Sequence, residues 1–199
     1  SRQTGNMRKS VCIFCASSGN VPREYMAAAA RIGHLCAAKK LCLVNGAGDV
    51  GLMGACSDAC LHQGGRVIGV IPRFMVERGW GHRSLPELVV TDNMATRRQR
   101  MRELSDGVIA LPGGCGTMEE LFETITQRQM GFYPHPIILL NTEGFYDGLI
   151  AWWKRAFDER FMRPDQGDLL SVAHTPDEAI RLFKELPDRN LTEEKLKER

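Results

Sequence analysis

One segment, at residues 107–130, constrains the fold of this chain more than any other. A short apolar run ends at Leu111, and the turn that follows it, at 112–117, reads Pro-Gly-Gly-Cys-Gly-Thr. Apolar residues then recur at helical spacing, at Met118, Leu121, Phe122 and Ile125. Glycines let the backbone approach a ligand closely, and the first N–H groups of a helix point outward without partners. The segment therefore predicts a strand, a turn and a helix that together can seat a phosphate.

Strand-like and helix-like segments alternate along the rest of the chain. The sequence predicts strands at 10–15, 41–45, 66–71, 87–91, 107–111, 136–140 and 169–173. It predicts helices at 25–40, 52–63, 94–105, 118–130, 146–161 and 176–186, and a loop at 73–86. Alternation with continuous apolar strands indicates an α/β fold, a doubly wound, Rossmann-like parallel sheet with helices on both faces. We expect a single domain at 10–187, between a disordered N-terminal tail at 1–9 and a charged C-terminal tail or helix at 188–199.

The composition is that of an ordinary globular protein and excludes several classes. Hydrophobic residues make up 43% of the 199 residues and charged residues 25%. A net charge of +2 gives no reason to expect a nucleic acid or an acidic membrane surface as partner. No apolar run could cross a bilayer and no signal-peptide pattern is present, which predicts a cytoplasmic protein. Neither the seven cysteines nor the five histidines have metal-site spacing, so no metal is expected.

Three turns follow predicted strands, at 16–19, 46–51 and 113–117, and ligands bind at such strand ends in doubly wound sheets. The second turn, Gly46-x-Gly48-x-x-Gly51, has the spacing of a dinucleotide fingerprint, which is a weak signal alone. It follows the second strand, and Arg73 stands near the position where an NAD site needs an acidic residue. An NADP site, with Arg73 on the 2′-phosphate, therefore stays open beside the alternative of a tight turn with close helix–strand packing.

Arg97 and Glu120 each have a structural and a functional interpretation. Arg97 falls on the apolar stripe of the helix at 94–105, where it either pairs with an anion or extends along the edge of the core. Periodicity alone does not decide between these two. Glu120 lies beside the predicted phosphate seat, but Thr117 and Glu120 also fit a capping box, which the local sequence alone favours.

The pattern Pro-Gly-Gly-x-Gly-Thr-x-x-Glu at 112–120 resembles the signature of the LONELY GUY proteins, which release the base from cytokinin riboside 5′-monophosphates. The same signature occurs in relatives called possible lysine decarboxylases. Residues 94–98, Met-Ala-Thr-Arg-Arg, are similar to the family's Met-x-x-Arg-Lys motif. The resemblance extends from Val11 to about Phe183. It implies that Arg97 and Glu120 are catalytic and act together.

The resemblance implies a phosphoribohydrolase that uses water to cleave the N-glycosidic bond of an adenine-type nucleoside 5′-monophosphate, a cytokinin nucleotide or AMP. The products would be the free base and ribose 5-phosphate. It further implies a homodimer and no metal or redox cofactor. Glu120 would stabilise the oxocarbenium-like ribose, bind its hydroxyls or orient the water, and Arg97 would keep Glu120 ionised. The expected substrate- and phosphate-binding residues are Ser17, Ser18, Gly46, Gly48, Met94, Arg98, Gly113, Gly114, Gly116 and Thr117.

Some alternatives remain open at this level. A non-catalytic protein of the same fold, similar to a molybdenum cofactor carrier, could bind a nucleotide or pterin cofactor. A pyridoxal phosphate decarboxylase is excluded because no lysine falls at a predicted carboxyl-terminal strand end. The preferred base, and a role in hormone production or nucleotide salvage, stay undetermined. The departures from the family pattern that bear on the base are Ala47, Ala95, Thr96 and Gln127.

Overall fold

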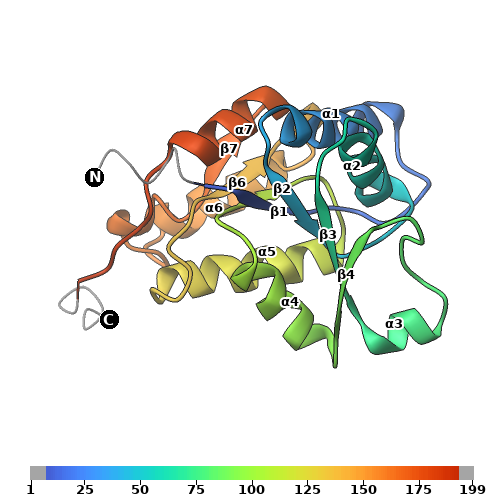
Figure 1. The fold of residues 1–199 in the computed structure, drawn as a ribbon. Coiled ribbons are helices and arrows are strands. Elements are labelled where there is room, and N and C mark those ends of the chain that lie inside the picture. The colour runs from blue at the N-terminus through green and yellow to red at the C-terminus, as the bar shows by residue number, and fades with distance from the viewer. Residues whose placement is uncertain (1–7, 193–199) are drawn as a thin grey trace.

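A seven-stranded parallel sheet forms the centre of the protein in the computed structural model, which describes residues 8–192 (Figure 1). The strands are β1 (Ser10–Phe14), β2 (Cys42–Asn45), β3 (Val67–Pro72), β4 (Glu87–Thr91), β5 (Val108–Ala110), β6 (Ile137–Leu140) and β7 (Ser171–Ala173). Their order is β4-β3-β2-β1-β5-β6-β7, and every neighbouring pair is parallel. The predicted fold class is confirmed.

Helices cover both faces of this sheet. They are α1 (Arg23–Ala38), α2 (Gly51–His62), α3 (Arg73–Glu77), α4 (Met94–Glu103), α5 (Cys115–Gln129), α6 (Asp147–Asp158) and α7 (Pro176–Glu185), with short 3-10 turns at Thr142–Gly144 and Pro164–Gln166. One core cluster joins α1, α2 and α7 to the sheet, and the other joins α4, α5 and α6 to its opposite face (Figure 1). Successive residues of β1 alternate between the two clusters, which explains its continuous apolar sequence.

The strand order reverses beside β1, and this reversal positions the ligand site. The chain passes from β1 through β2 and β3 to the edge strand β4, and then returns to place β5 on the other side of β1. Ligands of doubly wound sheets bind outside the carboxyl ends of the strands at such a point. The turn at 16–19 follows β1 and the glycine turn at 112–117 follows β5, so both border this crevice.

The structure corrects two details of the sequence-based prediction. The predicted loop at 73–86 begins with the short helix α3, whose five residues are too few to show a helical period. The packed part of the chain also extends beyond the predicted limits of 10 and 187. Arg8 is buried and donates to the carbonyl of Phe183 and to the carboxylate of Asp188. The parts of those predictions at 1–7 and 193–199 lie outside the described residues.

No helix in the described part of the chain is both long and apolar enough to cross a membrane.

Candidate active site

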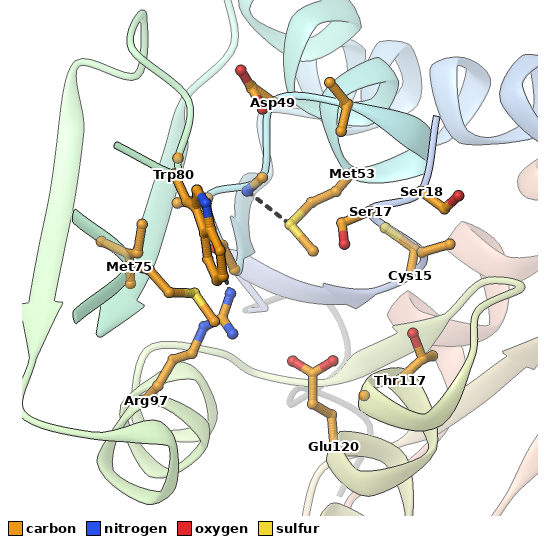
Figure 2. A pocket seen from close by; sticks show the side chains of 18 of the residues that line it. Cys15, Ser17, Ser18, Asp49, Met53, Met75, Trp80, Arg97, Thr117 and Glu120 are labelled. Atoms are coloured by element: carbon orange, nitrogen blue, oxygen red, sulfur yellow. Dashed lines mark hydrogen bonds between the residues drawn. The ribbon is translucent and has the colours of Figure 1, made fainter. Parts of the chain in front are cut away.

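A cavity of about 620 Å³ opens at the carboxyl edge of the sheet, where the strand order reverses. The turns after β1, β2 and β5 line it, together with α4, α5 and the segment that follows β3 (Figure 2). Most of the predicted site residues meet in this cavity, namely Ser17, Ser18, Gly46, Gly48, Met94, Arg97, Gly114, Gly116, Thr117 and Glu120. Two predicted residues, Arg98 and Gly113, are not part of its lining.

The glycine turn leads directly into α5, with Gly114 as the N-cap. Gly113 packs closely against the side chain of Thr117, and a Cβ added at Gly113 would lie 2.1 Å from Thr117 Oγ1. Gly113 therefore permits the tight turn without lining the cavity. Thr117 is buried at the third helical position and makes no capping bond. The capping-box interpretation of Thr117 and Glu120 is therefore wrong, because the helix begins earlier than that box requires.

Glu120 lies one turn beyond Thr117 along α5 and projects into the cavity (Figure 2). Burial raises the pKa of this carboxyl to about 7, although the charges of Arg97 and Arg98 act in the opposite direction. Arg97 alone therefore does not keep Glu120 fully ionised. A carboxyl group that titrates near neutral pH inside a cavity is typical of a functional site.

Arg97 is buried at the side of the cavity and is held by backbone carbonyls. Its Nε donates to the carbonyl of Val70 at 2.9 Å, and its Nη2 donates to the carbonyl of Gly46 at 2.5 Å. A Cβ at Gly46 would lie 2.2 Å from Nη2, so only glycine admits the guanidinium here. Arg97 thus fixes the turn after β2 and adds a positive charge to the cavity, whose effect is to lower the pKa of Glu120.

Arg98 has a different position from the one expected of a substrate-binding residue. Its guanidinium donates to Glu119 at 2.8 Å and to Glu123 at 3.0 Å, both on α5. These ion pairs join α4 to α5, the two helices that carry Arg97 and Glu120. Arg98 in this structure therefore positions one helix against the other.

The turn at 46–51 is packed by protein atoms, as the close-packing alternative expects. The amide of Gly48 donates to the sulfur of Met53 at 2.9 Å. Ala47, with φ 63°, holds a left-handed conformation that costs an alanine about 1–2 kcal/mol. Its Cβ is accommodated by Gly69 on β3, where an added Cβ would lie 2.6 Å away. The departure from the family glycine at position 47 is thus matched by a glycine on the next strand.

Comparison with known proteins agrees with this geometry. Residues 53–183 match the family model described as possible lysine decarboxylase. A probable cytokinin riboside 5′-monophosphate phosphoribohydrolase of Oryza sativa subsp. japonica is 41% identical over 176 residues, which are 88% of this chain and 72% of the relative. A cytokinin riboside 5′-monophosphate phosphoribohydrolase of Arabidopsis thaliana is 37% identical over 183 residues, 92% of this chain and 84% of the relative. The chain belongs to the LONELY GUY family.

Solved structures resemble the fold. The molybdenum cofactor binding protein of Rippkaea orientalis superposes with a TM-score of 0.69 at 22% identity, covering 89% of this chain and 97% of that one. The molybdenum cofactor carrier protein of Chlamydomonas reinhardtii gives 0.67 at 18% identity, covering 90% and 98%. At these identities the likeness extends to the fold alone.

The family model's description does not fit the cavity of this LONELY GUY protein. A lysine decarboxylase needs a lysine for its pyridoxal phosphate Schiff base. Among the described residues that line the cavity, the only cationic side chain is Arg97. The exclusion of decarboxylase chemistry from the sequence is consistent with this lining.

Sequence reasoning missed one wall of the cavity. This wall comes from the end of β3 and the segment after it, and consists of Ile71, Met75, Gly79, Trp80 and Gly81. A tryptophan between two glycines, outside any predicted strand or helix, was the signal that could have revealed it. On the α2 side, Asp49, Val50 and Met53 also line the cavity without having been predicted.

We expect Glu120→Gln to stabilise the free protein at pH 8 by about 1–3 kcal/mol. The pKa of Glu120 is about 7 in the folded chain, against an ordinary value of 4.5. At pH values between 4.5 and about 7 the folded chain binds more protons at Glu120 than the unfolded chain does. The contribution of Glu120 to the free energy of unfolding therefore falls as the pH rises. Glutamine has no charge to bury, so the free energy of unfolding of the variant relative to the wild type should increase from pH 5 to pH 8.

Urea unfolding of both proteins across that pH range measures the difference. Glu119→Gln serves as the control, because Glu119 is the exposed neighbour of Glu120 on the same helix. Its loss of a surface ion pair should cost at most about 1 kcal/mol and depend little on pH in this range. A Glu120→Gln advantage that did not change between pH 5 and pH 8 would contradict a raised pKa.

Proposed function

We propose that this protein is a phosphoribohydrolase that hydrolyses the N-glycosidic bond of adenine-type nucleoside 5′-monophosphates, cytokinin riboside 5′-monophosphates or AMP. The observation that carries the proposal is the carboxyl of Glu120, with its pKa raised to about 7, in the same cavity as the amino terminus of α5. The names of the rice and Arabidopsis relatives support the same activity.

The phosphate would lie at the start of α5. The first N–H groups of a helix lack partners within it, and the helix dipole favours an anion there. Gly114, Gly116 and Thr117 belong to this end of the cavity, and Ser17 and Ser18 from the turn after β1 add hydroxyl groups. The phosphate would thus be held mainly by backbone and hydroxyl donors.

The reaction breaks the bond between C1′ of the ribose and a nitrogen of the base. The bonding electrons leave with the base, which takes up a proton, and water supplies the hydroxyl that bonds to C1′. Positive charge develops on the ribose as the base departs, and the carboxylate of Glu120 opposes that charge, binds the ribose hydroxyls or orients the water. Arg97 positions the turn at Gly46 beside the sugar and favours the ionised form of Glu120.

A chromatographic screen of nucleoside 5′-monophosphates, scored for free base and ribose 5-phosphate, tests the proposal. AMP, N6-isopentenyl-AMP, GMP, IMP, CMP and UMP would be incubated with the wild-type protein and with Glu120→Gln. Release of base from at least one adenine nucleotide by the wild type, and not by the variant, supports the proposed activity. Absence of free base from all six nucleotides contradicts it.

A second candidate function is binding of a nucleotide or pterin cofactor without turnover, suggested by the fold shared with molybdenum cofactor binding and carrier proteins. The observation that favours it is the fold likeness alone. Mass spectrometry of the small molecules released from denatured protein distinguishes the two. A stoichiometric pterin would favour the carrier, whereas a protein without one that releases base from AMP would favour the hydrolase.

A homodimer, implied by the family resemblance, is our proposal for the assembly. Met130 and Phe132, beyond the end of α5, are exposed and apolar and fit a surface that a second copy covers. The nearby Tyr133 is buried, and its hydroxyl bonds with Ser105. A cytoplasmic location stays a prediction from composition.

Light scattering should give twice the chain mass of 22.2 kDa at micromolar concentration. Phe132→Ser should shift that mass toward the monomer, because it places a polar group in the apolar surface. Phe161→Ser is a matched control, since Phe161 is also highly exposed but follows α6 rather than α5. A mass near 22.2 kDa for the wild type across the micromolar range would remove the dimer proposal.

A further inference from the structure

The cavity has two chemically different ends. Figure 2 shows Met75 and Trp80 on one side and Cys15, Ser18 and Thr117 on the other, with Glu120 between the two groups. The second group lies at the turns after β1 and β5, where the phosphate seat was placed. The first end is lined by the apolar side chains of Ile71, Met75 and Met94 and by the indole of Trp80, with the guanidinium of Arg97 beside Met94.

Trp80 is held in a defined place although about half of its side chain is exposed. Its backbone N–H donates to the carbonyl of Met75 at 2.9 Å. The guanidinium of Arg78 lies 5.1 Å from the centre of the indole and 5.2 Å from the centre of the Phe74 ring. Arg78 therefore backs the indole through cation–π contacts, which favour one orientation of the ring.

The segment after Trp80 is bonded to the turn after β2 and to α2. The N–H of His82 donates to the carbonyl of Ala47 at 2.7 Å, and its ring pairs with Asp58 on α2 at 2.5 Å. Gly81 has φ 120°, a conformation that side-chain-bearing residues rarely adopt, and an added Cβ would lie 2.8 Å from Ile71. Trp80 is thus carried by a backbone fixed on both sides.

We infer that Trp80 is a specificity-determining residue, an aromatic platform on which the leaving base stacks. This inference rests on the proposed function and names how the same site recognises the base. With the phosphate at α5 and the ribose beside Glu120, the base extends toward the end that Trp80 and Met75 line. A nucleobase presents a flat π face, and stacking on an aromatic ring is the main attraction that such an end can supply.

A platform of this kind has a specific consequence for substrate choice. The side chains around Trp80 are apolar apart from Arg97, whose guanidinium already donates to the carbonyls of Val70 and Gly46, so selection depends mainly on stacking area and shape. Purine nucleotides should therefore bind better than pyrimidine nucleotides. An apolar group added to the exocyclic nitrogen of adenine should be tolerated rather than rejected, because Ile71, Met75 and Met94 supply apolar surface beside Trp80.

Calorimetric titration of AMP and of ribose 5-phosphate tests the inference in the Glu120→Gln background, where turnover does not interfere. Trp80→Ala should raise the Kd of AMP by about 5- to 150-fold, the range expected for the loss of one base stack. It should leave the Kd of ribose 5-phosphate unchanged within about twofold, because that ligand has no base. Trp80→Phe, which keeps a smaller ring, should lie between the two.

Trp152→Ala is the matched control, because Trp152 is equally exposed but lies on α6, outside the cavity. It should leave both Kd values unchanged, and thermal melts of all variants exclude unfolding as a cause. An unchanged Kd of AMP in Trp80→Ala would overturn the inference. So would equal weakening of both ligands, which would mean that Trp80 only shapes the cavity. Failure of the proposed hydrolase activity would appear separately, as a wild-type protein that binds AMP and releases no base.

Discussion

Glu120→Gln should lower kcat for AMP or a cytokinin nucleotide by about 10²–10³. Glutamine has nearly the same shape as glutamate and can accept hydrogen bonds from a ribose hydroxyl. It cannot supply the negative charge that opposes the developing charge on the ribose. Loss of a preorganised electrostatic contact of this kind costs about 2.7–4 kcal/mol in the transition state, which corresponds to that fall in rate.

The neighbouring Glu119 provides the control for this experiment. Glu119→Gln changes the same helix by the same chemistry at an exposed position outside the cavity, and should keep most of the activity. Since the pKa of Glu120 is about 7 in the free protein, wild-type kcat/KM should also fall as the pH drops below that value. A Glu120→Gln variant with most of its activity would show that the proposed mechanism is wrong.

The partnership of Glu120 with Arg97 is tested by combining their variants. Arg97→Ala removes the donor to the carbonyls of Val70 and Gly46, so the turn after β2 should shift and activity should fall by a similar factor. If the two residues act as a unit, the double variant should be little worse than either single one. Thermal melts are needed here, because two buried carbonyls lose their donor.

The sequence predicted the fold and the position of the site because both depend on local patterns. Strands buried on both faces appear as continuous apolar runs, and the glycine turn at 112–117 marks the carboxyl end of the strand next to β1. Arg97 was found by its place on an apolar stripe. The meeting of Arg97 and Glu120 in one cavity came from the family motifs, since no local pattern relates residues on separate helices.

Other features depend on packing between distant segments, which a single sequence does not display. The burial of Glu120 results from the cavity walls around it, which the position of Glu120 on its helix does not reveal. Arg98 appeared to be a binding residue by its place in the motif, but Glu119 and Glu123 on the next helix engage it. The sequence predicted only a loop for the wall around Trp80, because α3 is short. The hydrogen bond from His82 to Ala47, which holds this wall in place, joins residues 35 positions apart in sequence.

AMP should be a far better substrate than adenosine, with kcat/KM higher by at least about 10². The phosphate seat at the start of α5 offers backbone N–H groups and the hydroxyls of Ser17, Ser18 and Thr117. Charge-assisted hydrogen bonds to an anion contribute about 1.5–3 kcal/mol each, so the loss of two or three of them gives a difference of this size. Equal kcat/KM for the two substrates would contradict the seat.

A glycine substitution tests whether the phosphate binds at the glycine turn rather than elsewhere in the cavity. A Cβ at Gly116 meets no protein atom within 4 Å, so Gly116→Ala should fold normally while its methyl group narrows the space at the turn. The variant should lose most of the preference for AMP over adenosine, because only AMP needs that space. Gly148→Ala is the matched control: a Cβ there also meets no atom, and Gly148 lies on α6, outside the cavity. If Gly116→Ala kept the full preference for AMP, the phosphate would have to bind away from the glycine turn, and the assignment of Glu120 to the ribose would fail with it.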